Sequence, residues 1–224
     1  MTLIGRVSAL ALMALLLSPV PVRAAGADDA NRAVVAARNG QYEEAIELFT
    51  RAINSDELGL KNRAQAYAYR GYIKLVLGQP KEAVADLEKS AELLVWPYNV
   101  LWLHLARLKA GLPDAGPRSL ANNAITLDVK RNQDGTPGLA RWPGALVKFM
   151  QGTGTRDTVT AAAQEGDATR LAERVCDVDF YLAELDLARN DKASAITQFE
   201  RAAEKCPFAS FERMGATAEL MRLK

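Results

Sequence analysis

The chain has 224 residues, with 28 Lys and Arg, 27 Asp and Glu, one His and two Cys. This nearly neutral balance lacks the clustered basic surface that contacts with nucleic-acid phosphates require, so no nucleic-acid partner is expected. With so few cysteines and histidines, the sequence predicts neither a metal site nor a cofactor.

Residues 1–24 have the pattern of a secretory signal peptide. Arg6 precedes the apolar run Val7 to Leu17, and Val22-Arg23-Ala24 ends the segment, so we expect cleavage after Ala24. The run is too short to span a bilayer, and no cysteine near the cleavage site offers a lipid anchor. Cleavage removes two of the 28 basic residues and no acid, so 26 basic residues face 27 acidic ones. The mature chain is expected to be periplasmic or secreted, without a membrane anchor.

A helical hairpin is predicted between Ala64 and Leu94. Its first helix ends at Gly78 and its second begins at Pro80, in keeping with the preference for Gly after helix ends and Pro at helix starts. Gly71 and Ala83, twelve positions apart, are small enough to meet where the two helices cross.

The spacing resembles the tetratricopeptide repeat (TPR), a helix-turn-helix unit of about 34 residues. The residues that match its landmarks are Tyr67, Gly71, Ala83 and Leu87, whereas Arg70 and Lys74 replace an expected leucine and tyrosine. A family of this kind folds as an all-α solenoid of stacked hairpins, and that fold is the expectation here.

The same frame recurs along the chain. Ala33 and Ala183 stand twelve positions before Ala45 and Ala195, and Pro207 stands twelve positions after Ala195. A third unit is weaker: it has Gly111, then Gly116 and Leu120 at the alanine and phenylalanine positions, but His104 at the small position, which predicts a splayed hairpin. We expect about four to five helix pairs, with units at 26–59, 64–95, 97–130, 131–175 and 176–207 and a capping helix in 208–224.

The unit at 131–175 is divergent. Trp142-Pro143 is expected to open an apolar helix, as Trp96-Pro97 opens the third repeat, and a second short helix is expected near Arg156 to Glu165. The turn-rich stretch 131–138 is predicted to be an inserted loop that could contact a partner.

Cys176 and Cys206 fall at the two ends of the last predicted hairpin, which lie together when its helices run antiparallel. In an oxidising, exported setting this placement predicts a disulfide. A metal pair or a redox couple is the alternative, but the spacing is not C-x-x-C and no histidine is close in sequence.

No catalytic motif is present. The chain lacks HExxH, G-x-S-x-G and a Gly-rich phosphate loop, and its one histidine, His104, lies on an apolar stripe typical of a packed residue. Acidic positions such as Asp177 and Asp179 are expected on solvated helix faces. We therefore expect no enzyme and no catalytic residue.

The resemblance to TPR proteins implies a concave groove, lined by the first helix of each hairpin, that holds a peptide or helix of a partner. The positions that map to this groove are mainly apolar and aromatic: Tyr69, Tyr72, Tyr98, Leu101, Trp102, Leu105, Phe180 and Tyr181. Burial of these side chains between neighbouring helices is the alternative interpretation.

The fragment LANNA at 120–124, the Trp142-Pro143 helix and the closing unit 176–207 are similar to bacterial periplasmic TPR adaptors of the cell envelope. That resemblance implies a non-catalytic scaffold with a protein or peptide partner. The alternative is an envelope enzyme or glycan-binding protein that uses the same groove, and it requires an acid pair or metal cluster with perturbed ionisation there.

Overall fold

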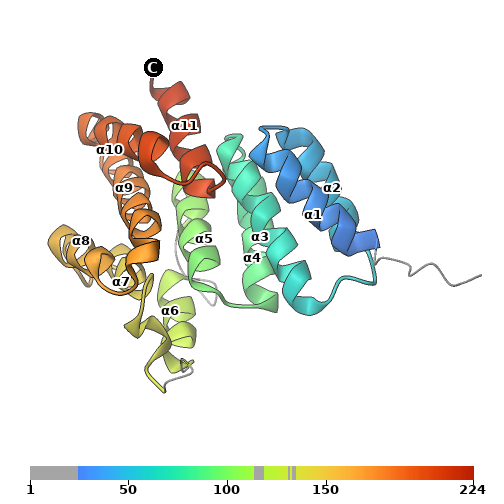
Figure 1. Ribbon diagram of the computed structural model, residues 1–224, viewed down its shortest axis with the longest axis horizontal. Coiled ribbons are helices and arrows are strands. Elements are labelled where there is room, and N and C mark those ends of the chain that lie inside the picture. The colour runs from blue at the N-terminus through green and yellow to red at the C-terminus, as the bar shows by residue number, and fades with distance from the viewer. Residues whose placement is uncertain (1–24, 114–118, 131, 133–134) are drawn as a thin grey trace, which may run out of the picture.

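The computed structural model describes residues 25–113, 119–130, 132 and 135–224 (Figure 1). Every regular element within these residues is a helix, which confirms the all-α fold. In chain order they are α1 (Ala25–Arg38), α2 (Tyr42–Asn54), α3 (Leu60–Val76), α4 (Pro80–Leu93), α5 (Pro97–Lys109), α6 (Leu120–Val129), η1 (Gly138–Ala140), α7 (Gly144–Met150), α8 (Arg156–Gln164), η2 (Ala168–Arg170), α9 (Leu171–Ala188), α10 (Lys192–Lys205) and α11 (Phe211–Leu223). The predicted signal peptide lies outside the described residues.

Three pairs of consecutive helices pack tightly against each other: α1 with α2, α3 with α4, and α9 with α10. Each pair is joined by a turn whose residue has a positive φ, namely Gly40 at 77°, Gly78 at 76° and Asn190 at 63°. Glycine and asparagine tolerate this left-handed conformation, so the turn occupies the same place in each pair.

The small residues meet at the helix crossings, as the spacing predicts. Ala45, Ala83 and Ala195 are fully buried, and a Cβ added to Gly71 would lie only 2.8 Å from Cγ of Leu87. Little side-chain volume separates the backbones here, which allows the helices of each pair to approach closely.

Polar side chains reinforce the second pair at the two positions where the TPR pattern is not met. Arg70 donates to both carboxylate oxygens of Asp86 at 2.6 and 2.8 Å, and Lys74 lies 2.7 Å from the same carboxylate. Asp86 is buried, so this paired network replaces the apolar contacts that leucine and tyrosine would make.

The middle of the chain is less regular. α6 begins at Leu120 after the N-cap Ser119 and packs only loosely on α5, in line with the expected splayed unit. Gly116, assigned to that unit, lies outside the described residues. In the divergent unit α8 occupies the predicted second helix, while Pro143 precedes α7 as its N-cap rather than entering its first turn. Within 131–138, Arg131 and residues 133–134 lie outside the described residues.

The last helix, α11 (Phe211–Leu223), makes contacts beyond those expected of a capping helix. α11 packs against α10, and it also contacts α3 and α9, so it lies between the second hairpin and the last one (Figure 1). Arg222 near its C-terminus donates to the main-chain carbonyl of Val76 at the end of α3. The C-terminal helix therefore folds back onto α3.

Candidate functional site

A groove of about 1550 Å³ runs along the N-terminal halves of α3, α5 and α9. Its remaining walls come from the end of α6, the segment from Gly138 to Lys148, the residues between α8 and α9, and the turn that leads into α11. The aromatic side chains that line it are Tyr69, Tyr72, Trp96, Tyr98, Trp102, Trp142 and Phe211. The groove thus combines residues from distant parts of the sequence.

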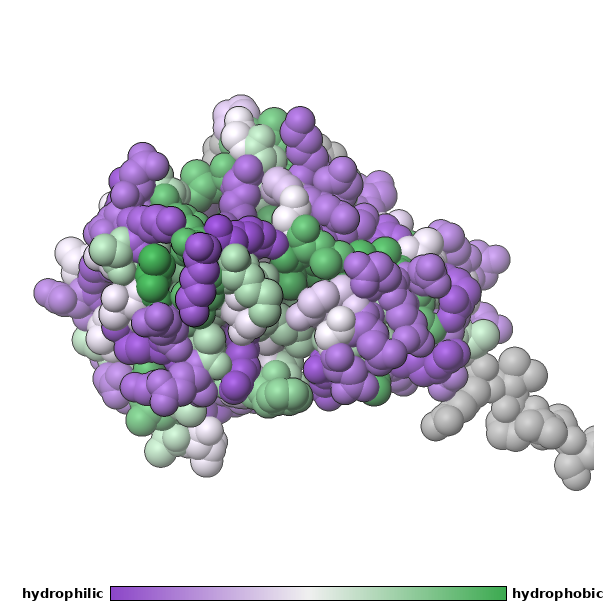
Figure 2. Space-filling view, turned by 90° about the horizontal axis from the view of Figure 1, so that it is seen from above, coloured by the Kyte–Doolittle hydropathy of each residue, from purple (hydrophilic) through white to green (hydrophobic). Residues whose placement is uncertain are grey.

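The eight predicted groove residues separate into two sets. Tyr69, Tyr72, Tyr98 and Trp102 line the groove, although Tyr72 and Trp102 are only 3% and 1% exposed. The other four are buried in the core and do not line it: Leu101, Leu105, Phe180 and Tyr181. For these four the prediction of an accessible surface is corrected, because neighbouring helices and α11 cover that side of α5 and α9. Figure 2 shows apolar side chains in the middle of one face of the molecule, between polar flanks.

Two carboxyl groups stand at the inner wall of the groove. Oδ2 of Asp177 on α9 accepts hydrogen bonds from the Tyr98 hydroxyl at 2.7 Å and from the Trp142 indole nitrogen at 2.9 Å. Glu212, in the first turn of α11, accepts a hydrogen bond from the Trp102 indole. Three neutral donors thus hold two acids at the point where α5, α9 and α11 converge.

Both acids have raised pKa values. Burial raises the pKa of Asp177 well above 3.8, and the nearby Glu212 raises it further, despite the hydrogen bonds from Trp142 and Tyr98. Burial also raises the pKa of Glu212 above 4.5, with Glu173 adding to the effect. Removing water and placing like charges together both disfavour ionisation, so the pair retains a proton to higher pH than free carboxyls do.

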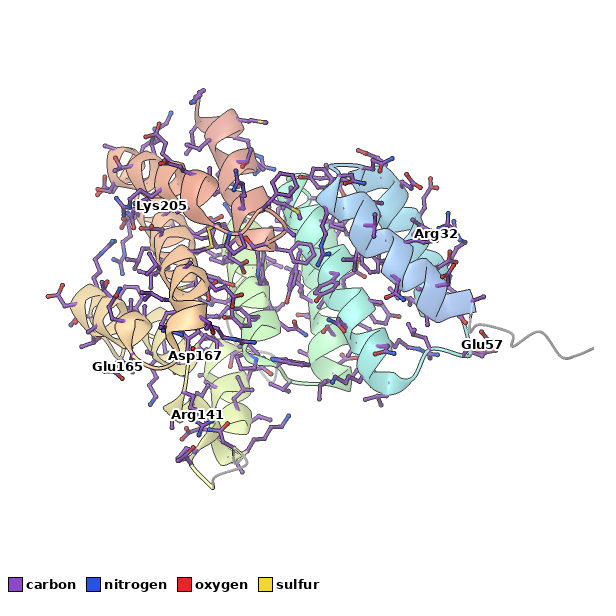
Figure 3. The ribbon with its side chains drawn as sticks, viewed as in Figure 1. Arg32, Glu57, Arg141, Glu165, Asp167 and Lys205 are labelled. Carbon is purple, nitrogen blue, oxygen red and sulfur yellow. A yellow bond between two sulfur atoms is a disulfide. The ribbon has the colours of Figure 1, made fainter. Side chains whose placement is uncertain are left out.

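The mouth of the groove carries positive charge. Lys61, Lys130, Lys148 and Arg170 line it, and within the part of the chain that the structure describes none of these four makes an ion pair. Lys61 lies over the Trp96 ring at 5.6 Å. Arg141, Glu165 and Asp167, which Figure 3 labels, also line the groove, so its lining contains acids as well as bases.

The disulfide is present. Cys176 and Cys206 are bonded, and Cys176 also lines the groove. The bond fixes α9 one residue before Asp177 to the chain that enters the turn to α11. The bond therefore ties the part of α9 that carries Asp177 to the segment that leads into α11.

Metal binding has no support in the described residues. No group of three or more His, Cys, Asp or Glu side chains comes close enough there to hold an ion. Among the same residues, none of the helices combines the length and apolar character needed to span a membrane.

Sequence reasoning did not identify Glu212, Trp96 and Trp142 as groove residues, and it assigned Asp177 to a solvated face. Trp142 precedes a helix and was interpreted as a packing residue, while Glu212 lies in the predicted cap. No local pattern links either residue to Asp177, because they are separated from it by 35 positions in each direction.

No protein-family model matches the sequence, and no curated protein matches it. Inferences about function therefore depend on the groove itself.

Proposed function

We propose that the protein is an exported TPR-like scaffold that holds a segment of a partner protein in the groove. The observation that best supports this function is the groove of about 1550 Å³, whose walls include aromatic side chains. Small-molecule pockets span about 300 to 1,000 Å³, so this groove suits a length of polymer better than a cofactor. Aromatic side chains give large contact areas at little cost in rotamer entropy.

Fewer aromatic side chains are accessible in this groove than the sequence pattern predicts. Trp96 is 44% exposed and Tyr69 and Tyr98 are partly buried, so these three are the aromatic side chains proposed to contact the partner. The cations at the mouth that form no ion pair with a described residue favour a partner segment that carries carboxylates, and such binding weakens with added salt.

The experiment is site-specific photo-crosslinking in cells that export the protein. A photoreactive residue replaces Gln65 or Lys148, which line the groove, and in matched controls it replaces Arg32 or Lys205, exposed positions on α1 and α10. Capture of the same partner from Gln65 and Lys148, and not from the controls, supports the proposal. Capture from the control positions alone would contradict it.

A second candidate is a glycan-binding or glycan-cleaving protein, favoured by the acid pair beside Trp142 and Tyr98. Glycosidases commonly use two carboxyl groups, one of which has a raised pKa. However, Oδ2 of Asp177 is already bonded to two donors, so the acid is held as part of the wall. We therefore rank this function second.

The two candidates differ in a direct assay. A glycan function predicts that the mature protein sediments with insoluble cell-wall glycan, or releases reducing ends from it, and that Asp177→Asn abolishes this. A protein scaffold predicts neither behaviour, whereas its photo-crosslinks to a protein remain.

A further inference from the structure

Trp96 is an exposed aromatic side chain at the mouth of the groove. It lies in the short link between α4 and α5, as the N-cap of α5, and it is 44% exposed. A ligand that covers the indole removes a large apolar area from water, and no core contact has to be broken first. Trp96 is therefore a contact point that needs no rearrangement of the fold.

Two lysines from distant parts of the chain converge on this tryptophan. Lys61, in the first turn of α3, places its ammonium nitrogen 5.6 Å from the centre of the Trp96 ring. Lys130, which follows α6, donates from its ammonium nitrogen to the main-chain carbonyl oxygen of Val95 at 3.2 Å. Both lysines and Trp96 line the groove. The indole thus lies beside two positive charges that come from different helices.

The two lysine charges have no acid beside them to balance them. Among the residues that the structure describes, neither Lys61 nor Lys130 forms an ion pair. Like charges near one side chain repel each other, and a carboxylate of a ligand relieves this repulsion. An ammonium group has three N–H donors, so Lys130 still has donors to offer after its bond to the main chain. The surroundings of Trp96 therefore favour a negatively charged group.

The arginines of the groove are less suited to bind an acidic ligand. Arg174 donates to two main-chain carbonyl oxygens, one of them that of Asp167. The pKa of the Asp167 carboxyl is lowered first by hydrogen bonds from Thr169. The charges of Arg174 and Arg170 lower it further, so both arginines already act on a carboxylate of the protein itself. Arg141 has a partner of its own.

The inner wall of the groove carries the opposite charge. Glu173, Asp177 and Glu212 line it, so a carboxylate of a ligand is repelled there and attracted at the mouth. Lys61 and Tyr69, eight positions apart, both line the groove and therefore lie on the same face of α3. A segment that follows this face passes from the basic mouth to an aromatic surface, which places the acidic part of the segment at the mouth.

We propose that Lys61, Trp96 and Lys130 form a subsite for an acidic residue and an adjacent aromatic or large apolar residue of the partner segment. The indole contacts the apolar side chain, and the two ammonium groups pair with the carboxylate. This description of the partner rests on the proposed function, although the subsite itself can bind a short peptide. A membrane surface also attracts lysine and tryptophan, but these three side chains line a concave groove that a flat bilayer does not enter.

The test is an NMR titration of the isotope-labelled mature protein with capped synthetic peptides. The chain contains three tryptophans, and Trp96→Phe identifies the indole signal of Trp96. The peptide GSEFEGS, which offers a carboxylate on either side of a ring, should shift this signal until it saturates. GSQFQGS, without carboxylates, and GSEAEGS, without the ring, should each bind about fivefold or more weakly. Added salt should weaken the binding of GSEFEGS.

Charge reversal distinguishes recognition of the carboxylate from a structural role of the lysines. A Lys61→Glu, Lys130→Glu double variant should bind GSEFEGS about tenfold or more weakly than wild type and should prefer GSKFKGS. Lys192→Glu, Lys205→Glu is the matched control, because both residues are exposed on α10 outside the groove, and it should bind every peptide as wild type does. Circular dichroism should show that all variants are folded, since the substituted lysines are exposed.

Three results would overturn the subsite: equal binding of GSEFEGS and GSQFQGS, no shift of the Trp96 signal with any peptide, or wild-type peptide binding by the Lys61→Glu, Lys130→Glu variant. Sedimentation with vesicles of phosphatidylglycerol and phosphatidylcholine, lost in that variant and without peptide binding, would assign the lysines to a membrane surface and also overturn it. The scaffold function is judged separately. Capture of a protein from Gln65 and Lys148 without peptide recognition would remove this subsite and leave the scaffold function supported.

Discussion

The ring of Phe211 at the start of α11 packs edge-on against the ring of Tyr72 on α3, with centroids 5.0 Å apart. This contact joins the last helix to the second hairpin and makes Phe211 part of the groove wall. A groove that a linear stack of hairpins would leave open is thus partly filled by the chain's own C-terminal segment.

The first prediction concerns this contact. Phe211→Ala should lower the free energy of unfolding by about 2 to 3 kcal/mol, because it removes a ring that bridges two apolar clusters. Urea unfolding measures the change. Phe208→Ala is the matched control three residues earlier, where the ring is 74% exposed, and should change stability by less than about 0.5 kcal/mol. Equal effects of the two substitutions on the free energy of unfolding would show that Phe211 does not bridge the two apolar clusters.

Local sequence patterns predicted the three regular hairpins because each depends on residues close in sequence: a small residue at the crossing, a turn and a second small residue twelve positions on. The disulfide followed from the same register. The path of α11 did not follow from the register of the repeats. The surface that α11 covers depends on how the irregular region from α5 to α8 orients the last hairpin relative to the second.

The candidate site was also predictable only in part, namely where a residue's position on its own helix decides whether it lines the groove. Tyr69 and Tyr98 were assigned to the groove by their places on first helices, and the structure places both there. The presence of Asp177 and Glu212 in one groove could not be derived, because it depends on how α11 folds back. Local amphipathicity describes which face of a helix is apolar, but not which distant helix will cover it.

A second prediction concerns the disulfide. Its closed loop spans a sequence separation of 30, for which chain entropy gives about 3 to 4 kcal/mol of stabilisation. Reductant should lower the melting temperature of the wild-type protein with little loss of helical signal. A Cys176→Ala, Cys206→Ala double variant should melt at the lower temperature and be insensitive to reductant. Two reactive thiols in the denatured, non-reduced protein would contradict the bond.

A third prediction concerns the buried network of the second hairpin. Asp86→Ala should destabilise the protein by about 3 kcal/mol, because the partly buried charges of Arg70 and Lys74 would lose the carboxylate that they share. Glu92→Gln breaks the exposed pair with Lys89 on the same helix and should cost at most about 0.5 kcal/mol. Chemical denaturation of both variants measures whether the buried ion pair contributes more stability than the exposed one. A loss of stability for Asp86→Ala as small as that for Glu92→Gln would contradict this prediction.

A fourth prediction concerns export. The main-chain nitrogen of Ala25 donates to the Glu57 carboxylate at 2.8 Å, so cleavage after Ala24 would place the new terminal ammonium group on that acid. Figure 3 shows Glu57 beside the start of α1. The exported protein should have a mass corresponding to residues 25–224 and the N-terminal sequence AGADDA. Retention of residues 1–24 in the exported protein would contradict the predicted cleavage.

The last prediction separates aromatic residues that hold the fold from those that contact a partner. Tyr72 and Trp102 are buried and pack on each other with ring centroids 4.7 Å apart, so Tyr72→Ala and Trp102→Ala should each cost about 3 to 5 kcal/mol of stability. Partner capture should fall in these variants only where unfolding occurs.

Trp96→Ala should behave in the opposite way. Its ring is 44% exposed at the groove, so the substitution should leave the melting temperature within about 2 °C of wild type while reducing crosslinked partner from Gln65 by about tenfold or more. Phe208→Ala, at an exposed aromatic outside the groove, should leave capture unchanged. Because Trp96 contributes contact area rather than core packing, unchanged capture in a folded Trp96→Ala variant would remove the groove mouth from the proposed interface.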